Sequence, residues 1–373
     1  MRFGTVVRRA LYAGLAAMVV VGATTGSAGA ASINAASIGA SSSNSSSSGI
    51  ASAGTTGSSP KGPPPRLGVA GGAVPNVITT PADGVFQYAQ ASQSTLADGA
   101  RGYYTIAKPV VAQSDAHSLA ELAVQSSDQK QVIEVGWTVD RALNGDDDPH
   151  LFVFHWIDGV RTCYNGCGFV PFNEPGYTAG MKLPVTSKPV QFNILHHGTE
   201  WRVGYNGHWV GAFPDSEWGN RFKVTGLVQW FGEVAAATAS SCTEMGNGQP
   251  ANSATAARIE RMGFAPARIT AAFATNATSP DAYSVLRTGT DSLRFGGPGA
   301  CRTVPNIVGL PKTLAAGAIT NSGFTVGSAT PMVDPLCDNL NTVISQTPAA
   351  GSRLPSGSRV NYQFGAPPRT GCP

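Results

Sequence analysis

The stretch Gln131–Val139, QVIEVGWTV, has the pattern of a β-strand and places one charged residue near its middle. β-Branched and aromatic residues dominate it, and turn-forming residues follow at Asn144–Asp148. Because side chains alternate along a strand, Ile133 and Val135 share one face while Glu134 falls on the other. A carboxylate among apolar residues is costly to ionise unless something pairs with it. Glu134 therefore marks a candidate site.

A second stretch later in the chain repeats this design. Val228–Val234, VQWFGEV, is another apolar strand pattern, and it carries the lone Glu233. If the two strands lie side by side in one sheet, both glutamates face one cleft. Two carboxyls within hydrogen-bond reach share a proton, because both cannot easily ionise. One could then activate a water that attacks an amide while the other protonates the carbonyl oxygen or the leaving amine, at acidic pH.

Short apolar runs separated by Gly, Pro, Asn and Asp recur from about Gln87 to Phe295. Many short strands with turns between them favour an antiparallel β-sandwich over βαβ units, so we predict a mainly β fold. The Asn206-Gly207 pair between two alternating runs predicts a type I′ hairpin. Ser118–Gln125 has a helix-like rhythm. The expected strands are Gly102–Val111, Gln131–Val139, Leu151–Ile157, Val190–His196, Glu200–Tyr205, His208–Phe213, Leu227–Val234, Ala256–Met262 and Arg268–Phe273.

The ends of the 373-residue chain differ from its middle, and the length allows more than one domain. Residues 1–30 combine a basic start, a short apolar run and the Ala28-Gly29-Ala30 end of a secretory signal peptide, so we expect export. Residues 31–80 are rich in Ser, Gly and Pro and predict a disordered linker. We place two domains at 81–298 and 301–366, and a tail at 367–373.

The cysteines suit an oxidising compartment. Cys163 and Cys167 are close enough to clip a single turn, and no second pair at ligand spacing exists to complete a zinc site. Fifteen pairings of six cysteines are possible. A Cys242–Cys301 disulfide would link the central domain to the segment that leaves it, and a Cys337–Cys372 disulfide would close a loop within the terminal unit. We expect no metal and no cofactor. The net charge of +3 gives no indication of nucleic-acid binding.

The unit from Cys301 to the end contains two ordered motifs. It opens with VPNIVGL at Val304–Leu310, continues through the helix-like Pro311–Ser322, and contains QTPAAG at Gln346–Gly351. These motifs resemble the opening and the QxPxxG turn of a PASTA domain. The resemblance implies a short helix packed on a three-stranded sheet, a cell-wall address and contact with peptidoglycan. The alternative is a spacer without a ligand.

The central region, about residues 100–275, resembles neprosin-type glutamic peptidases. The resemblance rests on IEVGW at Ile133–Trp137, on WFGEV at Trp230–Val234, and on the cysteine turn at Cys163–Val170 between them. In this family the glutamates of the first two motifs form the catalytic pair, which here means Glu134 and Glu233. The resemblance implies an antiparallel β-sandwich with an open cleft and endopeptidase activity, often after proline.

Several neighbours of these motifs are candidates to bind substrate. Trp137, Trp230 and Phe231 could line the cleft, although packing in the core explains an aromatic residue equally well. Tyr164 and Asn165 could orient substrate or could only shape the cysteine turn. Plant members of the family resemble a zymogen with a folded activation domain, whereas this chain has only the Ser/Gly-rich segment in that place.

Two other classes of protein fit the same pattern. One is a non-catalytic β-sandwich that binds wall glycans or proteins, and the other is a two-carboxylate glycoside hydrolase. Carboxyls bridged by one water favour a peptidase, whereas a separation of roughly 5–5.5 Å or more favours sugar hydrolysis. We predict a secreted, monomeric, metal-independent glutamic endopeptidase that acts on peptides or proteins.

Overall fold

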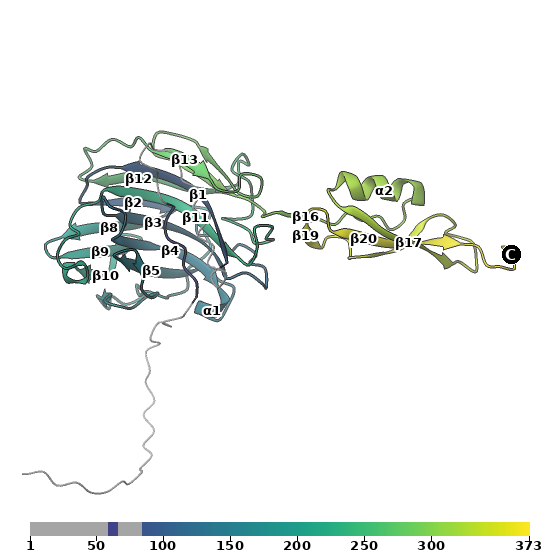
Figure 1. Cartoon of the computed structure of the whole chain (residues 1–373), viewed down its shortest axis with the longest axis horizontal. Helices are drawn as coiled ribbons and strands as arrows, with labels where there is room; N and C mark the ends of the chain where they lie inside the picture. Colours follow the sequence, from purple (N-terminus) through teal and green to yellow (C-terminus); the bar gives the residue numbers. More distant parts are fainter. Residues whose placement is uncertain (1–58, 66–83) are drawn as a thin grey trace, which may run out of the picture. The chain divides into compact units, whose positions relative to one another are not determined.

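The computed structural model describes residues 59–65 and 84–373 (Figure 1). The expected signal peptide and most of the expected linker lie outside the described residues. Within the described part, no helix is long and apolar enough to cross a membrane.

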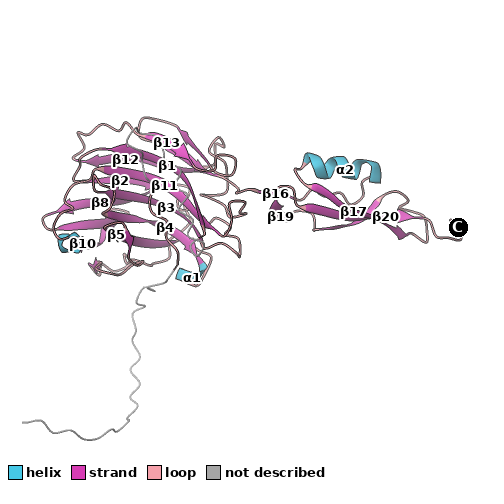
Figure 2. Cartoon of the chain, viewed as in Figure 1, coloured by secondary structure: helices cyan, strands magenta, loops and turns pink. Residues whose placement is uncertain are grey.

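The central region is a sandwich of two sheets that are antiparallel throughout, as predicted (Figures 1 and 2). The first sheet has the order β13 (Ala274–Ala277), β1 (Val85–Ser94), β11 (Leu227–Ala236), β3 (His117–Gln125), β4 (Val132–Asp140), β5 (His150–Ile157) and β6 (Val160–Arg161). The second sheet has the order β14 (Ser284–Arg287), β15 (Leu293–Gly296), β12 (Ala257–Ala265), β2 (Gly99–Tyr104), β8 (Val190–His197), β9 (Glu200–Tyr205), β10 (His208–Pro214) and β7 (Val170–Pro171).

Strand β4 is buried on both of its faces, and this burial explains its composition. Ile133, Val135 and Trp137 point into the core between the two sheets. The opposite, outer face of the same sheet carries a second apolar cluster, which includes Val132 of β4 and Phe231 of β11. Glu134 lies on this outer face, as the alternation predicts.

Strand β3 corrects two expectations from the sequence. The helix predicted at Ser118–Gln125 was wrong, because these residues form a strand that pairs with β4 on one side and with β11 on the other. Ala, Leu and Glu favour helices intrinsically, but burial between two neighbouring strands overrides that preference. The glutamate-bearing strands are therefore not side by side, since β3 lies between them.

Most other strand predictions are confirmed within a few residues. Asn206 and Gly207 both have positive φ, 52° and 85°, and connect β9 to β10 in the predicted hairpin. Arg268–Phe273 and Gly102–Val111 are exceptions: no strand forms at the first, since β13 begins only at Ala274, and the second is a strand only as far as Tyr104, where β2 ends. Among the sandwich residues that the structure describes, helical structure is limited to α1 (Arg141–Asn144) and a 3₁₀ turn at Asp215–Trp218.

The C-terminal unit has the helix and sheet expected of it. A three-stranded sheet, in the order β17 (Thr325–Val333), β20 (Arg359–Ala366) and β18 (Val343–Thr347), packs with helix α2 (Lys312–Asn321). A separate pair, β16 (Cys301–Thr303) and β19 (Arg353–Pro355), begins the unit. The disulfides are Cys163–Cys167, Cys242–Cys301 and Cys337–Cys372, so the expected turn clip forms.

Gly136 in β4 allows the close approach of β3 that the site requires. A Cβ atom there would lie 2.1 Å from the Ala120 carbonyl oxygen and 2.7 Å from Glu121 Cα.

We predict that Gly136→Ala lowers the free energy of unfolding by about 1–3 kcal/mol, because the backbone of β3 must shift to make room for the added methyl group. Urea unfolding measures this loss. The matched control is Gly263→Ala in β12, whose Cβ would meet only the end of the Arg101 side chain at 3.4 Å; an equal loss in both variants would contradict the prediction.

Candidate active site

Glu134 and Glu233 lie on the same outer face of the seven-stranded sheet, on either side of β3. Glu134 pairs in register with Ala123 of β3, and Glu233 pairs with Leu119. Between those two positions on the same face of β3 stands a third carboxylate, Glu121. All three side chains are fully buried.

One ammonium group brings the three carboxylates together. The Lys61 Nζ atom lies 2.9 Å from Glu121 Oε1, 3.2 Å from Glu233 Oε2 and 3.5 Å from Glu134 Oε2. Because the two predicted catalytic glutamates contact a single nitrogen atom, a group of the size of one water molecule can touch both. The side chains of these two strands therefore converge, although the strands are not adjacent.

Lys61 belongs to Ser59–Pro65, which covers this part of the outer face. The composition of residues 31–80 predicts a disordered linker, but Lys61, Gly62, Pro64 and Pro65 are buried against the sandwich. The prediction is corrected for this short part of the linker. Proline has no backbone N–H, so prolines can be buried without leaving donors unpaired.

A histidine and an aspartate stand behind Glu233. His117 Nε2 lies 2.8 Å from Glu233 Oε1, and His117 Nδ1 lies 3.6 Å from Asp140 Oδ2. Burial alone would lower the pKa of His117, but Asp140 and Glu233 outweigh it and raise that pKa above its usual value. A protonated His117 stabilises the ionised form of Glu233.

The surroundings shift the pKa values of the two glutamates in opposite directions. Burial raises the pKa of Glu134 to about 7; the Lys61 ammonium opposes this effect and the Glu233 carboxylate adds to it. Burial acts on Glu233 in the same sense, but Lys61 and His117 outweigh it and hold its pKa below the usual value. In weak acid, Glu134 therefore keeps its proton while Glu233 is ionised, which is the division of roles that an acid–base pair needs.

The other carboxylate and two tyrosines complete the electrostatics. Burial, reinforced by the charge of Glu134, raises the pKa of Glu121 well above its usual value. Burial likewise raises the pKa values of Tyr88 and Tyr164 well above theirs, so both hydroxyls remain donors. Lys61 Nζ lies 3.5 Å from Glu134 Oε2, and the Lys61 and Trp156 side chains both lower the pKa of Glu134 as hydrogen-bond donors.

Two of the predicted substrate-binding residues, Phe231 and Tyr164, contact Ser59–Pro65 over the glutamates. Phe231 is on the outer face, with its ring centroid 5.9 Å from Lys61 Nζ, and Tyr164 donates a 3.4 Å hydrogen bond from its hydroxyl to the Pro60 carbonyl. Asn165 instead joins the cysteine turn to β5, because its Oδ1 accepts from the Val153 amide.

The two predicted tryptophans lie elsewhere, which corrects their proposed role. Trp137 and Trp230 have the opposite parity to Glu134 and Glu233 in their strands, so their side chains enter the core between the sheets. Trp137 Nε1 donates to the Thr105 carbonyl and Trp230 Nε1 to the Arg101 carbonyl. The strand alternation that placed Glu134 on one face already put Trp137 on the other.

Sequence reasoning missed Glu121, His117 and Lys61. The first two belong to β3, whose helix-like rhythm concealed a strand with Glu121 on the same face as the catalytic candidates. Lys61 lies in a segment whose composition predicted a disordered linker. The available signal was the lone lysine among the prolines of Pro60–Pro65.

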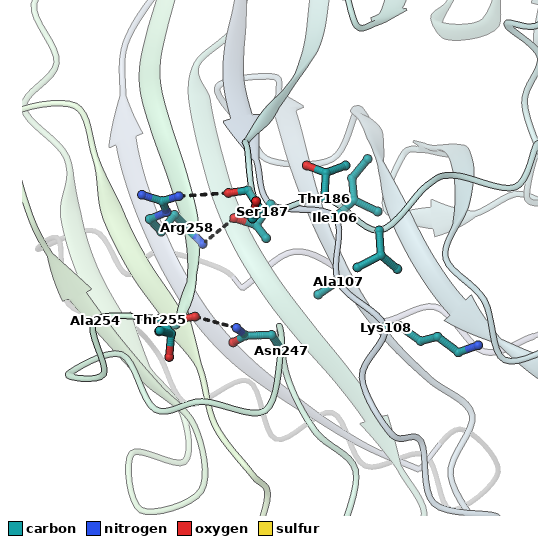
Figure 3. Close-up of a pocket in the computed structure, with 12 residues that line it drawn as sticks. Ile106, Ala107, Lys108, Thr186, Ser187, Asn247, Ala254, Thr255 and Arg258 are labelled. Atoms are coloured by element: carbon teal, nitrogen blue, oxygen red, sulfur yellow. Dashed lines mark hydrogen bonds between the residues drawn. The ribbon is translucent and has the colours of Figure 1, made fainter.

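An open hollow with a volume of about 530 Å³ lies beside the loop that follows β2, and the glutamates do not line it (Figure 3). Two of its polar side chains are engaged within its own wall: Arg258 Nη2 donates to the Ser187 carbonyl and Asn247 Nδ2 to the Thr255 carbonyl. Among residues 59–65 and 84–373, no cluster of His, Cys, Asp and Glu is arranged to hold a metal ion.

Comparison with known proteins gives two family matches in order along the chain. The Neprosin family model matches residues 114–298, and the PASTA domain model matches residues 302–361. No curated protein matches the chain.

The similar solved structures include two of scytalido-glutamic peptidase, one with a peptide-based transition-state analogue and one with a transition-state analogue inhibitor. Each is 10% identical and covers 58% of this chain and 98% of its own, with TM-scores of 0.33 and 0.36. A carbohydrate-binding module from Bacillus subtilis is 12% identical, covers 39% of this chain and 70% of its own, and has a TM-score of 0.22.

The Neprosin match supports a place in a glutamic-type peptidase family. More particularly, the chain carries a Neprosin domain followed by a PASTA domain. Ser59–Pro65 and strands β1 and β2 precede the matched residues, so Lys61 and Tyr88 are additions to the site from outside the family match.

The opposite pKa shifts predict opposite effects of two matched substitutions on stability. The folded-state pKa of Glu134 lies above its ordinary 4.5, so its contribution to stability is present below that value and lost as the pH rises to about 7. The lowered pKa of Glu233 gives a contribution that is present above its ordinary value and lost as the pH falls through the folded-state pKa.

At about pH 7.5, Glu134→Gln should therefore raise the free energy of unfolding and Glu233→Gln should lower it, each by about 1–3 kcal/mol. Urea unfolding of both variants, repeated at about pH 4 where the gain from Glu134→Gln should vanish, measures the difference. A shift of both variants in the same direction at the higher pH would contradict this assignment.

Proposed function

We propose that this protein is a secreted glutamic endopeptidase in which Glu134 and Glu233 activate water at acidic pH. The observation that carries the proposal is the convergence of these two buried carboxylates on one nitrogen atom, with their pKa values shifted apart. Two titratable groups whose environments separate their pKa values are the expected signature of an acid–base pair. The family match supports the same chemistry.

In this mechanism the ionised Glu233 takes a proton from a water molecule placed between the two glutamates. The water oxygen attacks the carbonyl carbon of the scissile peptide, while protonated Glu134 donates to the carbonyl oxygen. Collapse of the tetrahedral intermediate breaks the C–N bond, and the amine leaves with a proton from the pair. His117 orients Glu233 and stabilises its charge before the water is activated.

The segment over the site supports a preference for proline-containing peptides. Tyr88 donates a 2.9 Å hydrogen bond from its hydroxyl to the Pro63 carbonyl, and Gln229 Nε2 donates 2.7 Å to the Pro65 carbonyl. Both contacts serve carbonyl oxygens, which proline retains, and neither needs the N–H that proline lacks. A polyproline strand can therefore satisfy this surface.

The rival functions have less support from the described residues. The outer face offers Tyr88 and Gln229 as hydrogen-bond donors to the carbonyl groups of an extended peptide, which supports a peptide ligand. The C-terminal PASTA domain supports an address at the cell wall, with peptidoglycan or peptide as its ligand. The disulfides support export to an oxidising compartment.

The proposal predicts cleavage of a proline-rich protein by the full chain at about pH 4, where one carboxyl of the pair is protonated. The test uses Lys61→Met, which leaves the position between the glutamates free, alone and combined with Glu134→Gln or Glu233→Gln. Either glutamine substitution should lower kcat/KM at least about 100-fold. Activity should fall as the pH rises and Glu134, the acid of the pair, loses its proton.

Mass spectrometry of the fragments measures both the rate and the cleavage site. Equal cleavage by all three proteins, or cleavage by none of them, would contradict the proposed function. A flat profile between about pH 4 and pH 8 would contradict the assignment of Glu134 as the acid.

A further inference from the structure

The Lys61 ammonium is fully satisfied where it lies. Its three N–H groups donate to Glu121 Oε1 at 2.9 Å, to Glu233 Oε2 at 3.2 Å and to the Gly62 carbonyl at 3.2 Å. Its side chain has no exposed surface. A buried charge is stable only when it is paired and hydrogen-bonded, and Lys61 meets both conditions.

The backbone around Lys61 is held on both sides. Pro60 accepts from the Tyr164 hydroxyl, Pro63 accepts from the Tyr88 hydroxyl, and Pro65 accepts from Gln229. Gln229 also donates 2.7 Å to Gln90 Oε1 and accepts from Gln125, so a ladder of glutamines on three neighbouring strands supports the Pro65 end. The segment therefore lies in the site as a bound peptide would.

Gly62 shows how tightly the segment fits. A Cβ atom at this position would lie 2.4 Å from the Tyr88 hydroxyl oxygen and 2.6 Å from Phe86 Cδ1. Both atoms belong to rings of strand β1, whose register with β11 fixes their backbone. Only glycine fits without moving them, so the position next to Lys61 is shaped to the surface beneath it.

Glu121 is the part of this arrangement that the proposed reaction does not use. A water-activating pair needs two carboxyls, and Glu134 and Glu233 supply them. Glu121 makes the shortest of the three contacts with Lys61 Nζ and sits on β3, between the strands that carry the pair. A site that only activates water would not need the Glu121 carboxylate. A site that binds an ammonium group would use it as a hydrogen-bond acceptor.

We propose that Glu121, together with Glu134 and Glu233, forms a binding site for a lysine side chain, and that Lys61 fills it as an intramolecular inhibitor. The inference rests on the proposed function. The ammonium nitrogen stands between the two catalytic glutamates, where the water must stand, so lysine and catalytic water exclude each other. Ser59–Pro65 provides the backbone contacts that hold the lysine in place.

The first test compares the full-length wild type with variants that release the ammonium, using a proline-containing peptide at about pH 5. Lys61→Met should raise kcat/KM at least about tenfold, the equivalent of about 1.4 kcal/mol of lost inhibition. Glu121→Leu removes the acceptor and should raise the rate similarly, whereas Glu121→Gln keeps an acceptor oxygen and should stay inhibited. Equal rates for wild type and an active Lys61→Met would overturn the inhibition.

The second test does not depend on catalysis. Acylation of lysines by acetic anhydride at about pH 8, followed by mass spectrometry, compares Lys61 with Lys108 and Lys182, whose side chains are 50% and 56% exposed. Lys61 should react at least about tenfold more slowly than both.

The Gly62→Ala substitution displaces the segment and leaves the lysine side chain itself unchanged. In this variant, the acylation rate of Lys61 should come close to the rates of Lys108 and Lys182. Equal reaction of all three lysines in the wild type would overturn the binding site, whereas absence of cleavage by Lys61→Met would overturn only the proposed function.

Discussion

The structure of the site depends on one constraint: three carboxylates are buried together on one face of a β-sheet. Such a cluster is stable only when protons or a cation offset its charge, because the desolvation of each carboxylate is costly. Here both solutions operate. Glu134 and Glu121 have raised pKa values and retain protons, whereas Glu233 is ionised between Lys61 and His117. The division of roles between the two catalytic candidates follows from what surrounds each of them.

The sheet makes this arrangement possible because its outer face is covered. In most sandwiches one face of each sheet meets water, and a glutamate there would have an ordinary pKa. Here an apolar cluster, which includes Tyr88, Phe154 and Phe231, surrounds the carboxylates on that face, and Ser59–Pro65 lies over them. Burial is the first cause of the raised pKa values of Glu121 and Glu134. The fold therefore contributes the low-dielectric surroundings as well as the geometry.

Much of this could be predicted from local patterns. Alternation placed Glu134 and Glu233 on one kind of face, and the Asn206-Gly207 turn, the sandwich and helix α2 followed from equally local signals. The central strand β3 could not be recognised, because its Ala, Leu and Glu residues favour a helix and only pairing on both sides makes it a strand. With β3 assigned to a helix, Glu121 and His117 could not be placed beside the pair.

The segment Ser59–Pro65 illustrates a different limit. Composition predicts whether a stretch can form its own core, and this stretch cannot. It does not predict whether the stretch can lie on a core formed by others. Prolines lose little conformational entropy on binding and leave no N–H unpaired, so a proline-rich strand is well suited to lie along an apolar surface. Lys61 needs the three glutamates, which are distant from it in the sequence.

The most direct test of the central claim is a titration of the glutamate carboxyl carbons by nuclear magnetic resonance, from about pH 2 to pH 9, with signals assigned through single glutamine variants. We predict that Glu134 titrates near pH 7 and Glu233 below its ordinary value of 4.5. Ordinary titration of both carboxyls would show that the sheet does not separate them into an acid and a base, and would contradict the proposed roles of the two glutamates.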